Sequence, residues 1–101
     1  MTSSIKMRLQ RRDDEVTVRV LIRHPMAVGG RLKNGATIAP HYITEVTCTH
    51  QGAVVLRAHW GPGIAKNPYL SFVVPRAVSG DELVLRWLDN NDDFDEFRAT
   101  I

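Results

Sequence analysis

The amino-acid sequence predicts an all-β fold in which antiparallel sheets pack as a sandwich. Apolar and polar residues alternate with a period of two along most of the chain, as in strands buried on one face. Clusters of Gly, Pro, Asn and Asp separate these segments, and no segment shows a helical period. The pattern is typical of an immunoglobulin-like β-sandwich of about seven strands, with a small closed barrel as the alternative. We expect a single domain spanning residues 1–101.

Two strands are expected before the first long connection. Their inward positions are Ile5, Met7, Leu9, Val16, Val18, Val20 and Ile22. The connection from His24 to Pro40 is polar and rich in glycine. A connection of that length in a compact domain is commonly functional or mobile.

A hairpin follows the long connection. Its first strand runs from Tyr42 to His50, and "HQGA" supplies a turn with a glycine where positive φ is needed. The second strand runs from Ala53 to Trp60. Its predicted inward positions are Val54, Leu56, Ala58 and Trp60.

Three more strands complete the predicted fold after the loop that begins "WGPGIAKNP". Their inward positions are Leu70, Phe72 and Val74, then Leu83, Leu85 and Trp87, then Phe97, Ala99 and Ile101. The turns "SGDE" and "DNNDD" separate them. Within the opening loop, Pro68 should hold Asn67 in extended geometry and so determine where Tyr69 emerges.

The composition excludes several classes of protein. The net charge is only +2, and the one cationic cluster, residues 6–12, runs directly into acidic residues, so nucleic acid is not an expected partner. No apolar run is long enough for a membrane span. The amino terminus "MTSSIKMRLQ" lacks the apolar core of a secretory signal, and a single cysteine excludes an internal disulfide, so the cytoplasm is the default location.

Few residues are candidates for chemistry. Cys48 lies near His50, which could activate a thiol, but its strand position points toward the core and predicts a small buried hydrophobe. His41, His50 and His59 recur every nine residues, a spacing unlike zinc sites, and we expect scattered surface histidines and no metal.

Two further motifs fail as cofactor sites. The run from Asp89 begins like a calcium loop but carries Phe94 and Thr100 where that loop needs glycine and glutamate, so it predicts an acidic turn. No glycine-rich phosphate loop or serine elbow occurs, and neither an enzyme nor a cofactor is expected.

Apolar side chains at outward strand positions are the unusual feature of this sequence. These positions are Leu21, Val55, Tyr69, Val73, Val84 and Leu88. Exposed patches of this kind commonly mark protein partners. The alternatives are a sheet face covered by a loop, or a β-bulge that shifts the register.

Five segments resemble the SoxZ family of the thiosulfate-oxidising Sox system, in the same order and spacing over nearly the whole chain. They are "VTVRVLIRHPM", "IAPHYITEVT", "WGPGIAKNPYLSF", "GDELVLRWLDN" and the terminal "ATI". The family usually has an acidic residue and a threonine after "HPM", where this chain has Ala27 and Val28. Cys48 replaces an apolar strand residue, which agrees with burial.

The resemblance implies a non-catalytic subunit that pairs with SoxY. In that pair, SoxY carries sulfur intermediates on a cysteine of a flexible carboxyl-terminal arm, and separate Sox enzymes act on them. The resemblance also implies a periplasmic location, reached by export together with the signal-bearing SoxY, in place of the cytoplasmic default.

Aromatic residues are the type most suited to anchor the SoxY surface. The residues expected in or bracing that surface are Leu21, Trp60, Pro68, Tyr69, Phe72 and Val73. Two alternatives remain from the sequence: a self-associating β-sandwich module, and a sulfur-handling enzyme dependent on Cys48.

Overall fold

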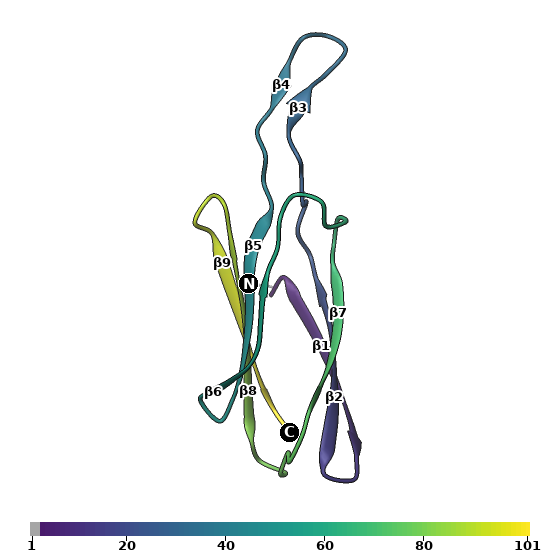
Figure 1. Cartoon of the computed structure of the whole chain (residues 1–101), viewed down its shortest axis with the longest axis vertical. Helices are drawn as coiled ribbons and strands as arrows, with labels where there is room; N and C mark the ends of the chain where they lie inside the picture. Colours follow the sequence, from purple (N-terminus) through teal and green to yellow (C-terminus); the bar gives the residue numbers. More distant parts are fainter. Residues whose placement is uncertain (1–2) are drawn as a thin grey trace.

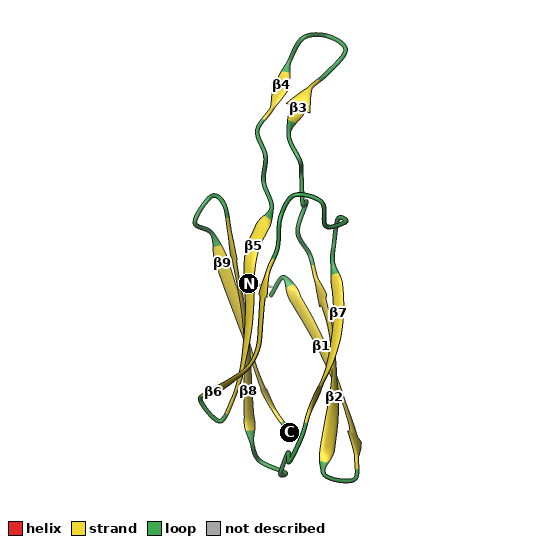
Figure 2. Ribbon diagram, in the orientation of Figure 1, coloured by secondary structure: helices red, strands yellow, loops and turns green. Residues whose placement is uncertain are grey.

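Two antiparallel sheets form the body of the computed structural model, which describes residues 3–101 (Figures 1 and 2). The three-stranded sheet has the order β1-β2-β7, with β1 (Ile5–Arg12), β2 (Glu15–Ile22) and β7 (Tyr69–Val74). The four-stranded sheet has the order β6-β5-β8-β9, with β6 (Ala53–His59), β5 (Ile43–His50), β8 (Glu82–Asp89) and β9 (Phe94–Thr100). The all-β prediction is confirmed. Residues 3–101 contain no helix that is long and apolar enough to cross a membrane.

The core lies between the two sheets. Burial alternates along β2, where Val16, Val18, Val20 and Ile22 are buried and the residues between them face outward. They form one apolar cluster with side chains of the opposite sheet, including Leu83 of β8. Full burial of one such aliphatic side chain stabilises the fold by about 1.5–3 kcal/mol.

A projecting hairpin occupies the long connection that the sequence left irregular. Strands β3 (Gly30–Arg31) and β4 (Thr37–Ile38) pair inside residues 28–40, which we call the arm (Figure 1). The arm lengthens the molecule to 55 × 24 × 21 Å and raises the radius of gyration to 15.7 Å. A compact domain of this size would have about 13 Å. Ala27 and His41 exchange backbone hydrogen bonds of 2.6 and 2.8 Å at the base of the arm.

A β-bulge overturns one predicted orientation. The pairing of β5 with β6 shifts register between Cys48 and Thr49, so that Val54 lies opposite Thr49. An extra residue reverses the alternation of side chains beyond it. Val54 is therefore 51% exposed, and its predicted inward orientation is wrong.

Several loops gather at the end of the sandwich that carries the arm (Figure 1). The β6–β7 loop joins the start of the long connection there, because Asn67 and His24 exchange hydrogen bonds. The β8–β9 turn joins it too, since the backbone N–H of Asn90 donates to the carbonyl of Tyr42 at 3.0 Å. This arm end brings together segments that are far apart in the sequence.

Candidate functional site

The outward face of the three-stranded sheet, which we call the β1-β2-β7 face, collects half of the predicted partner residues. Leu21 is the cross-strand neighbour of Tyr69, and Val73 lies opposite Thr17 four residues farther along the same strand pair. Leu21, Tyr69 and Val73 are 41%, 60% and 51% exposed. Apolar side chains this exposed are available for contact with another protein.

The other predicted partner residues do not lie on that face. Trp60 and Phe72 are half-buried and pack against the core. Pro68 is buried, and its carbonyl accepts a hydrogen bond of 3.0 Å from the backbone N–H of Ile22. The structure therefore places these three side chains beneath the exposed surface.

The residue before Pro68 departs from its predicted geometry. Asn67 has a φ of 51°, in the left-handed region and not in the extended one. Asparagine is among the residues that tolerate this region best. Its side-chain Oδ1 accepts the backbone N–H of His24 at 3.1 Å, and its own N–H donates to the carbonyl of His24. These bonds, and not Pro68, set the direction from which Tyr69 emerges.

Positive charge accumulates on the β1-β2-β7 face. Five cationic side chains lie on the outward side of β1 and β2 or at the end of β2, as strand alternation requires. They are Lys6, Arg8, Arg12, Arg19 and Arg23. Glu15 is the acidic residue in the same rows, opposite Arg12. Among residues 3–101 none of these cations makes a salt bridge, and Lys6 and Arg23 line a small pocket of about 230 Å³ beside Leu21.

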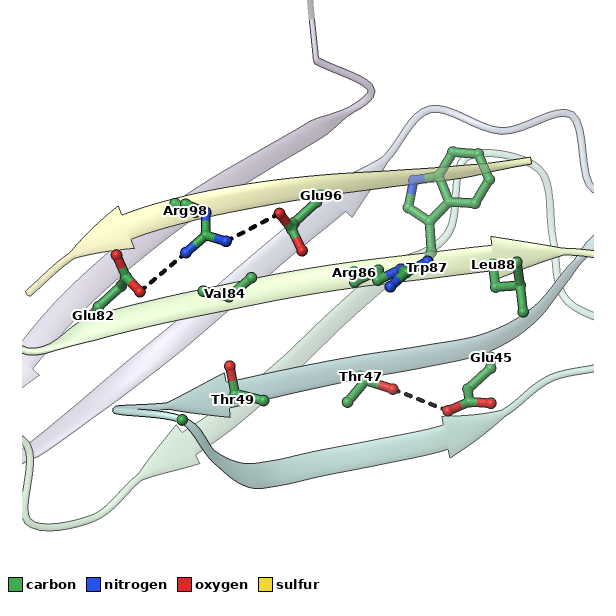
Figure 3. Close-up of a pocket in the computed structure, with 11 residues that line it drawn as sticks. Glu45, Thr47, Thr49, Glu82, Val84, Arg86, Trp87, Leu88, Glu96 and Arg98 are labelled. Carbon is green, nitrogen blue, oxygen red and sulfur yellow. Dashed lines mark hydrogen bonds and ion pairs between the residues drawn. The ribbon is translucent and has the colours of Figure 1, made fainter. Parts of the chain in front are cut away.

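The outward face of the four-stranded sheet is different, because its charges neutralise one another. Figure 3 shows Arg98 between Glu82 and Glu96, with N–O distances of 3.2 and 3.4 Å. Glu45 pairs with Arg57 at 3.5 Å. Glu45, Glu82, Glu96 and Arg98, together with Arg86, line an open groove of about 650 Å³. The groove therefore lacks the excess charge of the β1-β2-β7 face.

Cys48 lies in the core, as the strand pattern predicted. Its side chain is fully buried, and burial raises the pKa of the thiol to about 11. A thiol in such a site is almost entirely protonated at neutral pH, so the nucleophilic thiolate is scarce. Cys48 is not positioned for covalent chemistry.

A cluster of His24, His41 and Asp89, which was not predicted from the sequence, lies at the arm end. Asp89 Oδ2 is 3.0 Å from His24 Nε2 and 2.8 Å from His41 Nε2. Asp89 Oδ1 accepts the backbone N–H groups of Asn91 and Asp93. Burial on its own would raise the pKa of Asp89, but these hydrogen bonds outweigh it and lower the pKa below its ordinary value. The predicted acidic turn is therefore anchored by a buried carboxylate.

The hydrogen bonds of this cluster define which ring nitrogen of neutral His24 carries the proton. His24 Nδ1 accepts the backbone N–H of Met26 at 3.1 Å, so the ring proton of neutral His24 is on Nε2 and points at Asp89. A metal at His24 Nε2 would need the proton on Nδ1, facing another donor. Although the ligand atoms of His24, His41 and Asp89 lie within 4.8 Å of one another, this donor set does not fit a metal ion.

The predicted scattering of surface histidines holds only for His59, which is exposed. His41 is held by Asp89, and His50 Nε2 lies 2.7 Å from Asp81 Oδ2. The backbone N–H of Val78 and the His50 side chain lower the pKa of Asp81. Each histidine–carboxylate pair joins residues more than thirty positions apart, which spacing along the chain does not reveal.

Comparison with protein families decides the identity that the motifs suggested. The family model described as "Sulphur oxidation protein SoxZ" matches residues 5–100. The chain belongs to the SoxZ family. Membership makes it a subunit of the sulfur-oxidising Sox system. Comparison with curated proteins gives no match.

Solved structures show that the SoxZ-family fold is shared more widely. A superoxide reductase (neelaredoxin) variant from Ignicoccus hospitalis superposes with a TM-score of 0.67 at 21% identity, covering 99% of this chain and 79% of that chain. A reduced mutant of the superoxide reductase (neelaredoxin) from Archaeoglobus fulgidus has a TM-score of 0.66 at 17% identity, covering 98% of this chain and 89% of that one. At such low identity the likeness concerns the fold alone.

Proposed function

We propose that this chain is the non-catalytic subunit of a SoxYZ carrier complex and that it docks SoxY through the β1-β2-β7 face. SoxY then supplies the cysteine that carries sulfur intermediates. This chain stabilises SoxY and presents the carboxyl-terminal segment of SoxY to the Sox enzymes. Membership of the SoxZ family and the burial of Cys48 support the division of roles. We propose the periplasm as the location, reached by export with SoxY.

The observation that carries this proposal is the exposed pair of Leu21 and Tyr69, which are direct cross-strand neighbours. Burying apolar surface stabilises a complex by about 25 cal/mol per Å² before the costs of association are subtracted. Tyrosine is enriched among the residues that dominate interface energies. Tyr69 is 60% exposed and is therefore available for contact with a partner.

Substitution of Tyr69 tests the proposal. In complexes with SoxY, Tyr69→Ala should weaken binding by about 2 kcal/mol, roughly thirtyfold, as measured by calorimetry. Phe94→Ala is the matched control, because Phe94 is an aromatic residue of similar exposure, 59%, on the other sheet. Its effect on affinity should be small.

Two results would count against this assignment. Equal affinities for the wild type and Tyr69→Ala, with both folded, would remove Tyr69 as an anchor. A stable homodimer of the isolated chain that SoxY does not dissociate would favour the self-associating module instead.

A further inference from the structure

His41 is held so that one ring nitrogen faces solvent. Its Nε2 lies 2.8 Å from Asp89 Oδ2, and Asp89 is an ionised carboxylate that can only accept hydrogen bonds. Neutral His41 therefore carries its proton on Nε2 and a lone pair on Nδ1. Within residues 3–101, Nδ1 has no hydrogen-bond partner, and no buried side-chain nitrogen lacks one, so Nδ1 is open to solvent.

The surroundings fix the ring in this orientation. The side chain of His41 is 34% exposed, whereas those of Asp89 and His24 are almost fully buried. The His24 ring packs edge-on against His41, with ring centroids 4.6 Å apart, and also against Trp87, at 5.1 Å. The backbone of His41 is paired with Ala27 in both directions. A buried carboxylate that orients a partly exposed imidazole is the arrangement by which proteins set up a general base.

We infer that His41 is a proton acceptor for a thiol presented at the arm end, with Asp89 as its positioning residue. In this step the S–H proton moves to His41 Nδ1 and leaves a thiolate on the partner. His41 becomes an imidazolium whose charge faces the carboxylate of Asp89. The step transfers one proton and no electrons, so it needs no further reactant.

A thiol is the weak acid that best matches this acceptor. Free imidazole and free thiol have pKa values of about 6.5 and about 8.5, close enough for proton exchange near neutral pH, whereas aliphatic hydroxyls are far weaker acids. Cys48 cannot be the source, because it is fully buried in the core. The inference rests on the proposed function, in which SoxY supplies the thiol.

The position of His41 suits a partner on the β1-β2-β7 face. Leu21 and Tyr69 form the row nearest the arm end, and Asn67, two residues before Tyr69, is bonded to His24. His24 and His41 share the same carboxylate oxygen. A partner seated on that row therefore lies at the same end of the sandwich as His41.

The first experiment needs no partner. Nitrogen-15 NMR of the imidazoles in the isolated chain, recorded with His41 neutral, should show His41 protonated at Nε2 and unprotonated at Nδ1. The opposite tautomer would overturn the inference, because Nδ1 would then have no lone pair for a thiol proton. His59, exposed on β6, provides an internal reference for an imidazole without this constraint.

The second experiment measures the SoxY thiol in the assembled complex. The rate of its alkylation by iodoacetamide is followed against pH with SoxY saturated by this chain. His41→Gln, whose amide still donates to Asp89, should lower the rate near neutral pH on the order of fivefold and move the pH profile toward that of free SoxY. Asp89→Asn should shift the profile in the same direction.

His59→Gln is the matched control and should leave the profile unchanged. An intact His41→Gln complex with the wild-type pH profile would overturn the role of His41 while leaving the proposed function standing. Failure of the wild-type chain to bind SoxY would overturn both.

Discussion

At the scale of single residues, Asp89 connects more of the structure than its position in an acidic run suggests. Its carboxylate receives His24, His41 and the backbone of the β8–β9 turn, segments up to 65 positions apart. The sequence did contain a signal for this burial. Asp89 shares its strand parity with Leu83, Leu85 and Trp87, all of which face the core.

Loss of the Asp89 charge should reduce stability in a pH-dependent way. Its pKa is lowered in the folded state, so its contribution is complete above the unfolded value of about 3.9 and disappears as the pH falls through the folded value. Asp89→Asn should cost about 2–3 kcal/mol at neutral pH and flatten the acid side of the stability curve. Urea denaturation across the acid range measures both effects. A variant with the same acid dependence as the wild type would contradict this account.

At the scale of elements, the arm is independent of the core. Every residue from 31 to 40 is exposed, and the attachment is the paired backbone of Ala27 and His41. Gly29 at the base is required, because it has a φ of 80° and an added Cβ would lie 3.0 Å from the carbonyl oxygen of Ile38 and the nitrogen of Pro40. The conformation of the arm therefore depends on Gly29 and the Ala27–His41 pair at its base, and little on contacts with the rest of the fold.

Shortening the arm should leave the sandwich intact. Replacing residues 31–37 by Asn-Gly would join Gly30 to its partner Ile38 through a two-residue hairpin. Because no core side chain is removed, the free energy of unfolding should change by less than about 1 kcal/mol. Thermal unfolding followed by circular dichroism measures this. A loss of several kcal/mol would show that the arm contributes to folding.

At the scale of the whole molecule, the two outward faces differ in electrostatics although the net charge is only +2. Alternation along β1 places Lys6, Arg8 and Arg12 on one face, where Glu15 is the member of the following acidic run that lies in the same rows. Arg8 also lies directly opposite Arg19 on the neighbouring strand. Like charges in that position destabilise a sheet, and acidic groups on a partner would relieve the repulsion.

Arg19→Gln should therefore have opposite effects on the stability of the isolated chain and on its affinity for SoxY. The isolated chain should gain about 0.2–1 kcal/mol, since the repulsion with Arg8 is removed. The complex with SoxY should become weaker and less sensitive to salt, because one charge is lost from the contact surface. Denaturation of the isolated chain and binding at two salt concentrations measure these effects. Arg57→Gln is the control, because Arg57 is paired with Glu45 on the other sheet. An identical salt dependence for both variants would place the SoxY contact elsewhere.

The sequence was sufficient to predict the seven strands of the two sheets, most of their inward faces, the burial of Cys48 and the motifs of the SoxZ family, but not the β3–β4 hairpin. Each of these depends on neighbouring residues, because side-chain alternation is a local property of an extended chain. The predicted inward orientation of Val54 was wrong, because a β-bulge arises from pairing with another strand and is not visible in the alternation of one strand.

Contacts between distant residues followed from the tertiary fold and not from the local sequence. The excess of cations on the β1-β2-β7 face follows from strand order, and the joining of His24, His41 and Asp89 follows from which loops share an end of the sandwich. The alternation of apolar and polar residues is the same in every strand, so it does not determine which strands become neighbours. Packing of the two apolar faces selects that order, and with it the places where charge and hydrogen bonds accumulate.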